Sequence, residues 1–245
     1  MDLAGQTLLV TGASRGIGEA VARAAAAAGA TVVLMARDVG ALQRIADDIE
    51  AAGGPAPVLA PVNLEAATLA DHEALAELLA ARFGRLDAVL FNAAALGELA
   101  PLASYDPQLW PRVFQVNVHS VFLMIQSLLP LVLAAPRGTL LFTLAAEGLA
   151  AKPHWGAYGA SKAALRALME MLAQEHTNQP GFSAVGVVPP PTRTRLRFGA
   201  YPGEDRARLT APADVAPAFL ELLGPRGLAA RGQVLRLTAD GGLPA

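Results

Sequence analysis

The sequence predicts an α/β fold, a single doubly wound parallel sheet with helices on both faces. Short β-like runs alternate with longer helical runs over almost the whole chain of 245 residues. The β-like runs are continuously apolar, which is typical of parallel strands that are buried on both faces. Right-handed crossovers between such strands place helices on the two faces. A hydrophobic content of 53 % and a charged content of 16 % agree with a large core.

In the first half of the chain, four strands are expected to alternate with three helices. The second apolar run is rich in β-branched residues from Thr31 onward, which favours a strand. The helical runs are rich in alanine, and two of them are expected to stop at Gly53-Gly54 and at Gly84. The expected strands span 7–10, 31–36, 57–62 and 86–91, and the expected helices span 19–28, 38–52 and 67–83.

In the second half, a long helix bent by Pro111 and Pro130 comes first. Leucines and alanines at helical spacing and short apolar runs then predict the remaining elements. The expected helices span 107–135, 158–175 and 213–223, and the expected strands span 139–143, 183–188 and 234–237. The segment 189–210 is irregular and rich in Pro, Gly and Arg, so we expect a lid or binding loop there. No long linker interrupts the pattern, and we expect one domain over 1–245.

Composition excludes several function classes. The formal net charge of −2 provides no basic field for nucleic acid or an anionic membrane. The absence of cysteine excludes disulfides and thiolate chemistry, and the four histidines show no metal-ligand spacing, so no metal is expected. The first residues lack the pattern of a signal peptide, and the apolar stretch 121–135 is too short and too broken for a membrane span. We therefore expect a soluble cytoplasmic protein.

The most informative motif is the glycine-rich stretch from Thr11 to Gly18. It lies between the first expected strand and the first expected helix. Glycines let a backbone approach a pyrophosphate closely, and the free N–H groups at a helix start point at negative charge. A glycine motif alone is weak evidence, because many are merely turns, but here the strand before it and the helix after it are both present. This context favours a nucleotide role over a structural turn.

Tyr158 and Lys162 form the second motif. They are four residues apart on an expected helix, so both face the same side. An ammonium near a phenol favours the phenolate and lowers the tyrosine pKa, which would make the tyrosine a proton donor and acceptor near neutral pH. By spacing alone, a surface pair is the commoner interpretation of such a tyrosine and lysine.

Together these motifs resemble those of the short-chain dehydrogenase/reductases, over about Leu3 to Gly242. Several motifs in the family's order along the chain carry the resemblance: Thr11 to Gly18, Asn92-Ala93-Ala94, Asn117, Tyr158-Gly159-Ala160-Ser161-Lys162, Gly232-Gln233-Val234-Leu235 and Asp240-Gly241-Gly242. The pattern is most similar to a bacterial branch of poorly assigned oxidoreductases. The resemblance implies a Rossmann-type fold and hydride transfer between a nicotinamide cofactor and a small-molecule carbonyl or alcohol.

The resemblance also implies residue roles. Tyr158 would protonate the carbonyl oxygen, Lys162 would lower the tyrosine pKa and bind the nicotinamide ribose, and Asn117 would hold a water that relays protons. A buried or helix-kinking amide is the alternative for Asn117. The expected cofactor-binding residues are Gly12, Ser14, Arg15, Gly16, Ile17, Gly18, Arg37, Asn63, Leu64, Asn92, Ala93, Ala94, Tyr158, Lys162, Pro189, Thr192 and Thr194.

Charge favours NADP(H) over NAD(H). The ribose 2′-phosphate of NADP(H) needs cationic partners, whereas NAD usually meets an acidic residue after the second strand. Here Arg37 stands at that end, with no carboxylate before Asp38, and Arg15 lies in the nearby glycine loop. Two solvated surface arginines are the alternative. Asn63 stands where the family often has an aspartate that contacts adenine.

Three departures from the family pattern limit the catalytic expectation. Ala145 stands where the family has a serine that binds the substrate oxygen, and losing one such donor commonly costs on the order of 100- to 1000-fold in rate. Thr143, two residues back on the same strand face, should lie about 6 to 7 Å deeper than position 145 and is not expected to substitute for the serine. Glu147 and His154 could approach the substrate from the loop. Ala94 replaces a glycine. The third change is longer, Pro189-Pro190-Pro191, and it removes donors and restricts the loop.

Two hypotheses therefore stand. The first is an NADP(H)-dependent reductase or dehydrogenase, slowed by Ala145, with Tyr158 as acid and base. The second is a cofactor-binding sensor or assembly protein of the same fold without much catalysis. Five arginines in 193–208 would fit an anionic substrate, such as an acyl group on a carrier, but a solvated mobile lid is the preferred interpretation. The resemblance implies a homodimer or homotetramer built on the apolar helices at 113–133 and 165–172.

Overall fold

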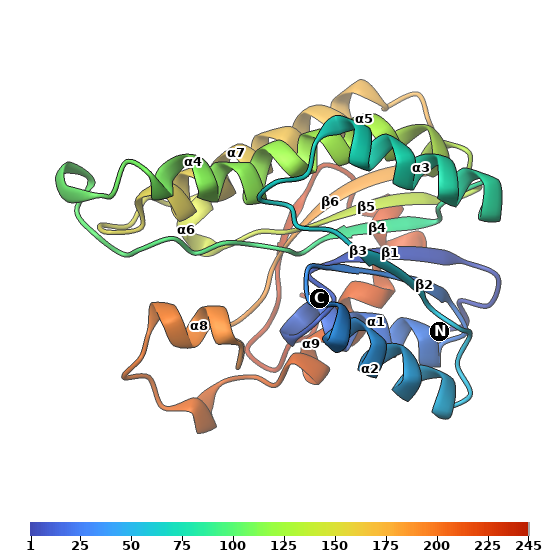
Figure 1. Ribbon diagram of the computed structural model, residues 1–245, viewed down its shortest axis with the longest axis horizontal. Coiled ribbons are helices and arrows are strands. Elements are labelled where there is room, and N and C mark those ends of the chain that lie inside the picture. Colours follow the sequence, from blue (N-terminus) through green and yellow to red (C-terminus); the bar gives the residue numbers. More distant parts are fainter. Residues whose placement is uncertain (245) are drawn as a thin grey trace.

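The computed structural model describes residues 1–244 and contains one seven-stranded sheet in which every pair of neighbouring strands is parallel. The strand order is β3-β2-β1-β4-β5-β6-β7, so the winding direction reverses between β1 and β4 (Figure 1). This confirms the predicted doubly wound sheet. The strands are β1 (Thr7–Thr11), β2 (Thr31–Ala36), β3 (Val58–Pro61), β4 (Ala88–Phe91), β5 (Gly138–Thr143), β6 (Phe182–Val188) and β7 (Val234–Arg236).

Helices cover both faces of the sheet, as Figure 1 shows. One face carries α1 (Gly16–Ala27), α2 (Val39–Ala51) and α9 (Pro212–Glu221). The other face carries α3 (Leu69–Phe83), α5 (Ser120–Leu133) and α7 (Gly156–Glu175). The shorter helices are α4 (Leu109–Phe114), α6 (Ala146–Leu149), α8 (Arg195–Ala200) and α10 (Pro225–Ala229).

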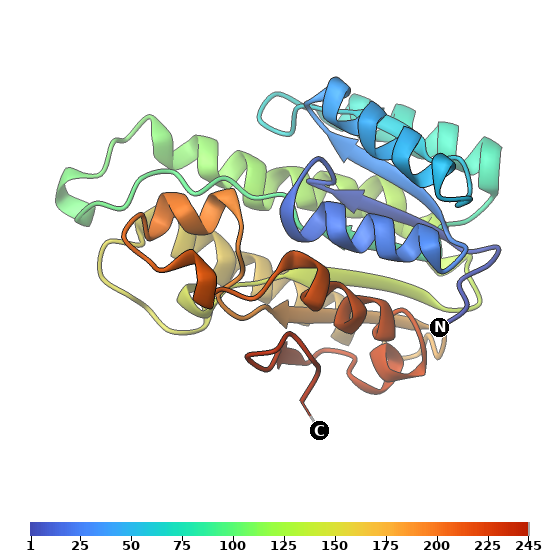
Figure 2. The same cartoon turned by 90° about the horizontal axis from the view of Figure 1, so that it is seen from below.

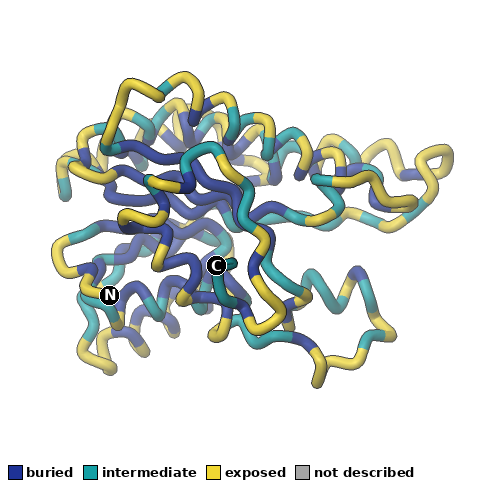
Figure 3. Tube along the Cα trace, turned by 180° about the vertical axis from the view of Figure 1, so that it is seen from behind, coloured by how far each residue is buried: buried dark blue, intermediate teal, exposed yellow. Residues whose placement is uncertain are grey.

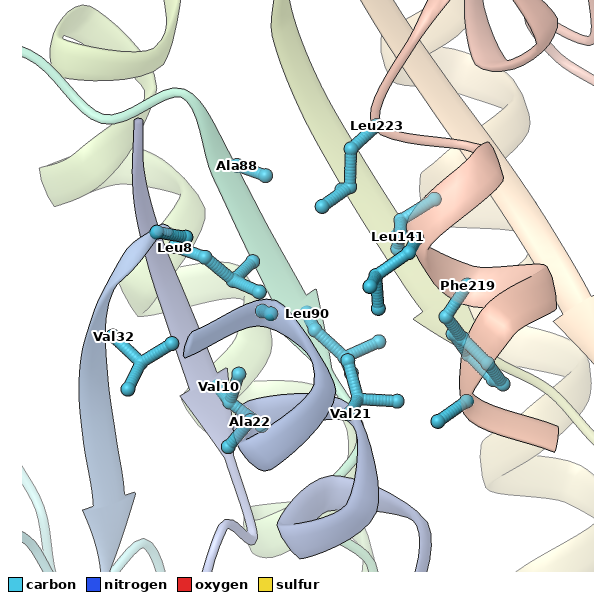
Figure 4. Packing of buried hydrophobic residues seen from close by; sticks show 14 of the residues in the cluster. Leu8, Val10, Val21, Ala22, Val32, Ala88, Leu90, Leu141, Phe219 and Leu223 are labelled. Carbon is cyan, nitrogen blue, oxygen red and sulfur yellow. The ribbon is translucent and has the colours of Figure 1, made fainter. Parts of the chain in front are cut away.

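The two covers create two hydrophobic cores, because successive residues of a strand point to opposite faces. In β1, Leu8 and Val10 belong to the core under α1 and α9, whereas Leu9 belongs to the core under α3, α5 and α7. Figure 4 shows the first of these cores, with Phe219 of α9 packed near Leu141 of β5. The strands form the buried centre in Figure 3, whereas exposed residues lie on the outer sides of the helices and on the loops. The continuous apolar runs of the sequence reflect this double burial.

The long helix expected at 107–135 is present but not uniform. It begins at α4, passes through a π-helical turn at Gln115–His119 and continues as α5. Pro111 lies in the first turns, where a missing N–H is tolerated, and Pro130 lies in the last turn of α5. The combined helix Leu109–Leu133 is long and apolar enough to cross a membrane, a test that the core helix of a soluble protein also passes. It packs against α3 and α7 and belongs to the second core.

The largest difference from the sequence prediction lies in 189–210. This segment is not irregular throughout, because it contains α8 and a 3-10 turn at Arg206–Arg208. Its two ends are joined by backbone bonds, from Arg193 N–H to the Thr210 carbonyl (2.9 Å) and from Thr210 N–H to the Pro191 carbonyl (3.1 Å). In Figure 2, α8 (orange) lies beyond the ends of the strands. The local sequence could not show this, since the helix is only six residues long and begins at the side-chain cap of Thr194.

Candidate active site

A cavity of about 280 Å³ lies at the carboxyl ends of β1, β4, β5 and β6. Ligands of doubly wound sheets bind at this edge, where the strand order reverses. Segments far apart in sequence line the cavity: the glycine loop, the loop after β4, the end of β5, the start of α7, the loop after β6, and α8. The cavity therefore joins most of the predicted motifs in one place.

The glycine loop has the geometry of an anion cradle. Gly12 and Gly16 have φ angles of +67° and +63°, which a side chain would strain. A Cβ atom on Gly18 would overlap the Gly12 carbonyl and approach the Asn92 Nδ2 atom to 2.6 Å, so the start of α1 packs directly on both loops. Arg15 is the N-cap of α1 and forms no side-chain cap bond. The first N–H groups of α1 are thus oriented for a phosphate.

Thr11, at the end of β1, organises the neighbouring loop. Its hydroxyl donates to the Leu90 carbonyl (3.2 Å) and accepts from the N–H groups of Asn92 (2.9 Å) and Ala93 (3.0 Å). The Asn92 side chain in turn donates to the Thr11 carbonyl (3.2 Å). This clamp fixes the loop after β4 against the glycine loop. Sequence reasoning included Thr11 in the motif but missed its role, because the contact joins residues about eighty positions apart.

Tyr158 and Lys162 face the cavity from the first turns of α7 and are both buried. The Lys162 Nζ atom donates to the Thr143 carbonyl of β5 (2.6 Å) and lies 5.7 Å from the centroid of the tyrosine ring. Burial lowers the pKa of Lys162 to about 8. Burial, and secondarily the charge of Glu147, raise the pKa of Tyr158 above its ordinary value. The expected lowering of the tyrosine pKa is therefore wrong for this geometry, because desolvation of the phenolate outweighs a lysine whose own charge is disfavoured.

Asn117 lies in the π-helical turn before α5 and is buried. Its side-chain oxygen accepts from Ala95 N–H (2.8 Å), and its amide nitrogen donates to the Ala95 carbonyl (3.0 Å) and to the Ser161 hydroxyl (2.9 Å). The Ser161 hydroxyl donates to the carbonyl of Tyr158 (2.8 Å). The side chain of Asn117 thus joins the loop after β4 to the helix of Tyr158 and Lys162. π-Helical turns are frequent at functional sites.

The position of the missing serine lies inside the cavity. Ala145 lines it and is the N-cap of α6. The hydroxyl of Thr143 is directed to the Asn92 side chain (3.4 Å), which agrees with the expectation that it does not substitute. Of the two loop residues considered, Glu147 lines the cavity, whereas His154 lines a neighbouring hollow.

Of the residues expected at the adenosine end, Arg15 lines the cavity, whereas Arg37 and Asn63 lie outside it. Arg15 and Arg37 are exposed, and within residues 1–244 neither forms an ion pair with a carboxylate. The carboxylate of Asp38 is turned away to cap α2, where it accepts from Ala41 N–H (3.0 Å). Asn63 is exposed and accepts from Glu65 N–H (3.3 Å) in a turn after β3.

The loop after β6 lines the cavity on the side where the family resemblance implies the nicotinamide. The hydroxyl of Thr192 donates to the Pro190 carbonyl (2.7 Å), and the hydroxyl of Thr194 accepts from Arg197 N–H (3.2 Å) at the start of α8. The methyl group of Thr194 lies 3.3 Å from the position of a Cβ on Gly16. The proline run therefore still brings the threonine beside the glycine loop.

Most, but not all, of the expected site residues meet around the cavity. Those lining it are Gly12, Arg15, Gly16, Ile17, Asn92, Ala93, Ala94, Tyr158, Lys162, Pro189, Thr192 and Thr194. Those that do not line it are Ser14, Gly18, Arg37, Asn63, Leu64 and Asn117. Leu64 is a core residue, and Ser14 borders a smaller hollow beside α1 and α2. Two further lining residues, Trp155 and Leu196, are not among the site residues expected from the sequence. No cluster of metal-ligating side chains occurs among residues 1–244.

Comparisons with known proteins agree with this geometry. A sequence model described as short chain dehydrogenase matches residues 6–204. The uncharacterized oxidoreductase YciK of Escherichia coli K12 is 40 % identical over 217 residues, covering 89 % of this chain and 85 % of that protein. A short chain dehydrogenase structure from Pseudomonas syringae has a TM-score of 0.93 at 40 % identity, covering 96 % of this chain and 95 % of that one. An Escherichia coli CFT073 short chain dehydrogenase complexed with NADPH has a TM-score of 0.92 at 38 % identity, covering 96 % and 97 %.

Proposed function

The chain belongs to the short-chain dehydrogenase family of oxidoreductases, which use a nicotinamide cofactor, and from this premise we propose that it interconverts a carbonyl and an alcohol with NADP(H). One observation carries the proposal. Tyr158 and Lys162 line the same cavity as the glycine loop, so a proton-transfer pair and a dinucleotide cradle share one site. The substrate would be a small-molecule carbonyl or alcohol bound beside Tyr158 in this cavity.

Each residue has a distinct task in the proposed mechanism. The bound nicotinamide supplies or accepts the hydride. The Tyr158 hydroxyl donates a proton to the carbonyl oxygen during reduction and takes it back during oxidation. Because burial raises the pKa of Tyr158, the hydroxyl is protonated near neutral pH, which is the form that donates the proton during reduction. The Lys162 ammonium stabilises the phenolate left after the proton has moved. Asn117 holds the loop after β4 and the helix of Tyr158 in register.

The residues present fit a dinucleotide. Gly12, Gly16 and Gly18 keep the space beside the start of α1 free of side chains, and the α1 N-terminus offers its N–H groups. For the adenosine 2′-phosphate, the exposed guanidinium groups of Arg15 and Arg37 support a preference for NADP(H) over NAD(H). Asp38 supports the same preference, because its carboxylate already accepts a hydrogen bond as the side-chain cap of α2. The same assignment includes Ser14, Ile17, Asn63, Leu64, Asn92, Ala93, Ala94, Pro189, Thr192 and Thr194 as cofactor contacts.

A second function is supported by the cavity itself. Ala145 offers no hydroxyl to the substrate oxygen, and Pro189-Pro190-Pro191 offers no N–H groups above the nicotinamide. These features favour a slow enzyme, or a protein of the same fold that binds NADP(H) as a sensor or assembly partner. Asn117 is connected through the Ser161 hydroxyl to the carbonyl of Tyr158, and Lys162 lines the cavity beside Tyr158. The presence of these three residues supports the enzyme as the better assignment.

The proposal extends to the whole chain. Residues 1–245 would act as one cytoplasmic domain, with 189–210 as the lid over the substrate. Exposed apolar side chains on the two long helices, Phe122 of α5 and Met171 of α7, support burial in a homodimer or homotetramer. Sedimentation of the purified protein distinguishes these assemblies from a monomer.

The proposed reaction is tested by stopped-flow oxidation of NADPH against a broad panel of carbonyl compounds. We expect turnover with at least one class of ketone or aldehyde. Tyr158→Phe should lower the rate about 100- to 10,000-fold, because general acid catalysis is lost. It should change the Kd of NADPH far less than the rate.

A matched surface variant provides the control. Glu77→Gln on the exposed side of α3, away from the cavity lining and from the two helices of the proposed interface, should retain the parent rate. Equal activity of Tyr158→Phe and its parent would remove the proposed acid and base. Tight NADPH binding without turnover on any substrate would transfer the assignment to the sensor or assembly function.

A further inference from the structure

Two residues beyond the missing serine, the chain carries a carboxylate, Glu147, on the wall of the cavity. Its backbone is fixed by two glycine contacts between α6 and α7. A Cβ on Gly148 would overlap Lys162 (2.6 Å to its Cβ), and a Cβ on Gly159 would come within 3.1 Å of the Glu147 carbonyl oxygen. The short helix α6 therefore lies directly against the turn of α7 that carries the proposed proton donor. Glu147 cannot move away from this turn without displacing α6.

The side chain of Glu147 is held from the other side by the segment that contains α8. Its Oε1 atom lies 3.5 Å from the hydroxyl of Tyr201, which follows α8. Tyr201 accepts from the Lys152 Nζ atom (2.5 Å), packs on Trp155 with ring centroids 5.7 Å apart, and lies under the guanidinium of Arg197 (3.8 Å). The carboxylate thus bridges the two sides of the substrate end of the cavity, with the aromatic rings behind it.

Glu147 forms no ion pair within residues 1–244. The nearby cations have other partners or are solvated. Arg197 is bound through two nitrogens by Glu204 (2.7 and 2.6 Å), and Lys152 is bound to Tyr201. Arg195 lines the cavity but is exposed, so water and salt screen it. Lys162 donates to the Thr143 carbonyl. The half-buried carboxylate of Glu147 therefore retains acceptor capacity toward the cavity.

We infer that Glu147 is a specificity-determining residue that accepts a hydrogen bond from the substrate. This rests on the proposed function and names the substrate class of the same site: carbonyl compounds that carry a hydrogen-bond donor, such as a hydroxyl group, next to the carbonyl. If the substrate placed an apolar or anionic group beside Glu147, the carboxylate would lack this hydrogen bond. Binding of ethers and 2-oxo acids is therefore disfavoured. Ala145 removes the donor that would hold the carbonyl oxygen, and Glu147 supplies an acceptor that holds the neighbouring hydroxyl.

The test compares binding of three ligands that differ at one group: a hydroxymethyl ketone, its methyl ether and a 2-oxo acid. Their Kd values are measured by calorimetry on the protein alone and on the protein saturated with NADP⁺, in which a ketone cannot be reduced. We expect the parent to bind the hydroxymethyl ketone at least about tenfold more tightly than the ether, because hydrogen bonds to charged groups are strong. The 2-oxo acid should bind most weakly.

Two substitutions make the result specific. Glu147→Leu should abolish the preference for the hydroxyl over the ether. Glu147→Gln keeps an acceptor oxygen without the charge, so it should retain part of that preference while gaining affinity for the 2-oxo acid. Glu77→Gln, on the exposed side of α3, should match the parent with all three ligands.

An unchanged hydroxyl-to-ether ratio in Glu147→Leu would overturn the inference, and so would an equal change for all three ligands. Failure of the proposed function has a different signature. In that case NADPH does not bind or no carbonyl is reduced, while the ratio measured on the protein alone still reports on Glu147.

Discussion

The two halves of the cavity are built on different physical grounds. The cofactor half, formed by the glycine loop and the loop after β4, depends on backbone fit. A side chain would strain the positive φ angles of Gly12 and Gly16, and a side chain at Gly18 would overlap the Gly12 carbonyl. The substrate half depends on side chains that reach across from separate segments, such as Glu147 to Tyr201. Backbone fit leaves a recurring sequence motif, whereas side-chain contacts between distant loops do not. Apart from Ala94, the chain keeps the family motifs in the cofactor half, whereas Ala145 in the substrate half lacks the hydroxyl of the family serine.

If this contrast holds, the substrate half should accommodate an added hydroxyl group, and the rate of reduction should increase. Ala145→Ser restores a hydroxyl where the family has one. Because an aligned donor stabilises charge that develops on the substrate oxygen, we expect kcat of reduction to rise about 100-fold. The Kd of NADPH should not change. Stopped-flow kinetics measures both quantities.

The double variant Ala145→Ser with Tyr158→Phe is the control for this gain. A serine that acts with the tyrosine gives no increase in that background. An increase of the same size there would mean that the serine acts on the fold, for example as an improved N-cap of α6.

The cofactor half should instead reject one added methyl group. In Gly18→Ala, the new Cβ meets the Gly12 carbonyl and the Asn92 side chain, so the two loops must separate. Overpacking of this kind costs about 1–3 kcal/mol, and we expect NADPH affinity to fall about 10- to 100-fold. Fluorescence titration measures the affinity. Gly40→Ala in α2 is the matched control, because its Cβ would have only one neighbour, an Asp38 oxygen at 3.7 Å. Normal NADPH affinity in Gly18→Ala would contradict the close-packed cradle.

Charge at the adenosine end provides a finer test of the cofactor half. Arg37→Asp replaces a cation near the proposed 2′-phosphate by an anion. We expect the Kd of NADPH to rise at least about tenfold, since a charge-assisted hydrogen bond is lost and a repulsion is gained. The Kd of NADH should change much less. Equal changes for the two cofactors, measured by calorimetry, would mean that Arg37 does not select the phosphate.

The smallest expected effect concerns pH and joins the two halves at Lys162. Its buried ammonium has a pKa lowered to about 8, so it is charged below that pH and neutral above it. A neutral lysine no longer stabilises the Tyr158 phenolate. We therefore expect kcat/KM to fall about twofold at pH 8 and about tenfold at pH 9, as one proton is lost. A profile that stays flat through pH 9.5, recorded on a parent with full NADPH saturation, would show that this charge is not needed.

The sequence predicted the layers and the cofactor half because both leave local signals. Alternating apolar and helical runs correspond to the doubly covered sheet, and the strand before Gly12 and the helix after Gly16 are both present. Boundaries were less accurate. The first helix begins at Gly16 rather than at residue 19, because glycines were expected to remain in the turn.

The substrate half could not be predicted in the same way. Helix α8 was missed because six residues carry too little periodicity, and its position depends on the cap at Thr194 and on the distant bonds of Tyr201. The expected shift of the Tyr158 pKa has the wrong direction, because residue spacing indicates proximity to Lys162 but not the desolvation of the phenol. Glu147 was recognised only as a residue that could approach. Contacts between residues far apart in sequence decide each of these points.

The backbone bonds from Arg193 to Thr210 and from Thr210 to Pro191, which join the two ends of the segment 189–210 to each other, have a consequence for evolution. The segment therefore leaves the body of the domain after β6 and rejoins it before α9 at nearly one point, so lengthening or exchanging the stretch in between leaves the strands where they are. New substrate ranges could thus arise by replacing that stretch as a cassette, and transplanting the corresponding piece from a relative is a practical route to altered selectivity.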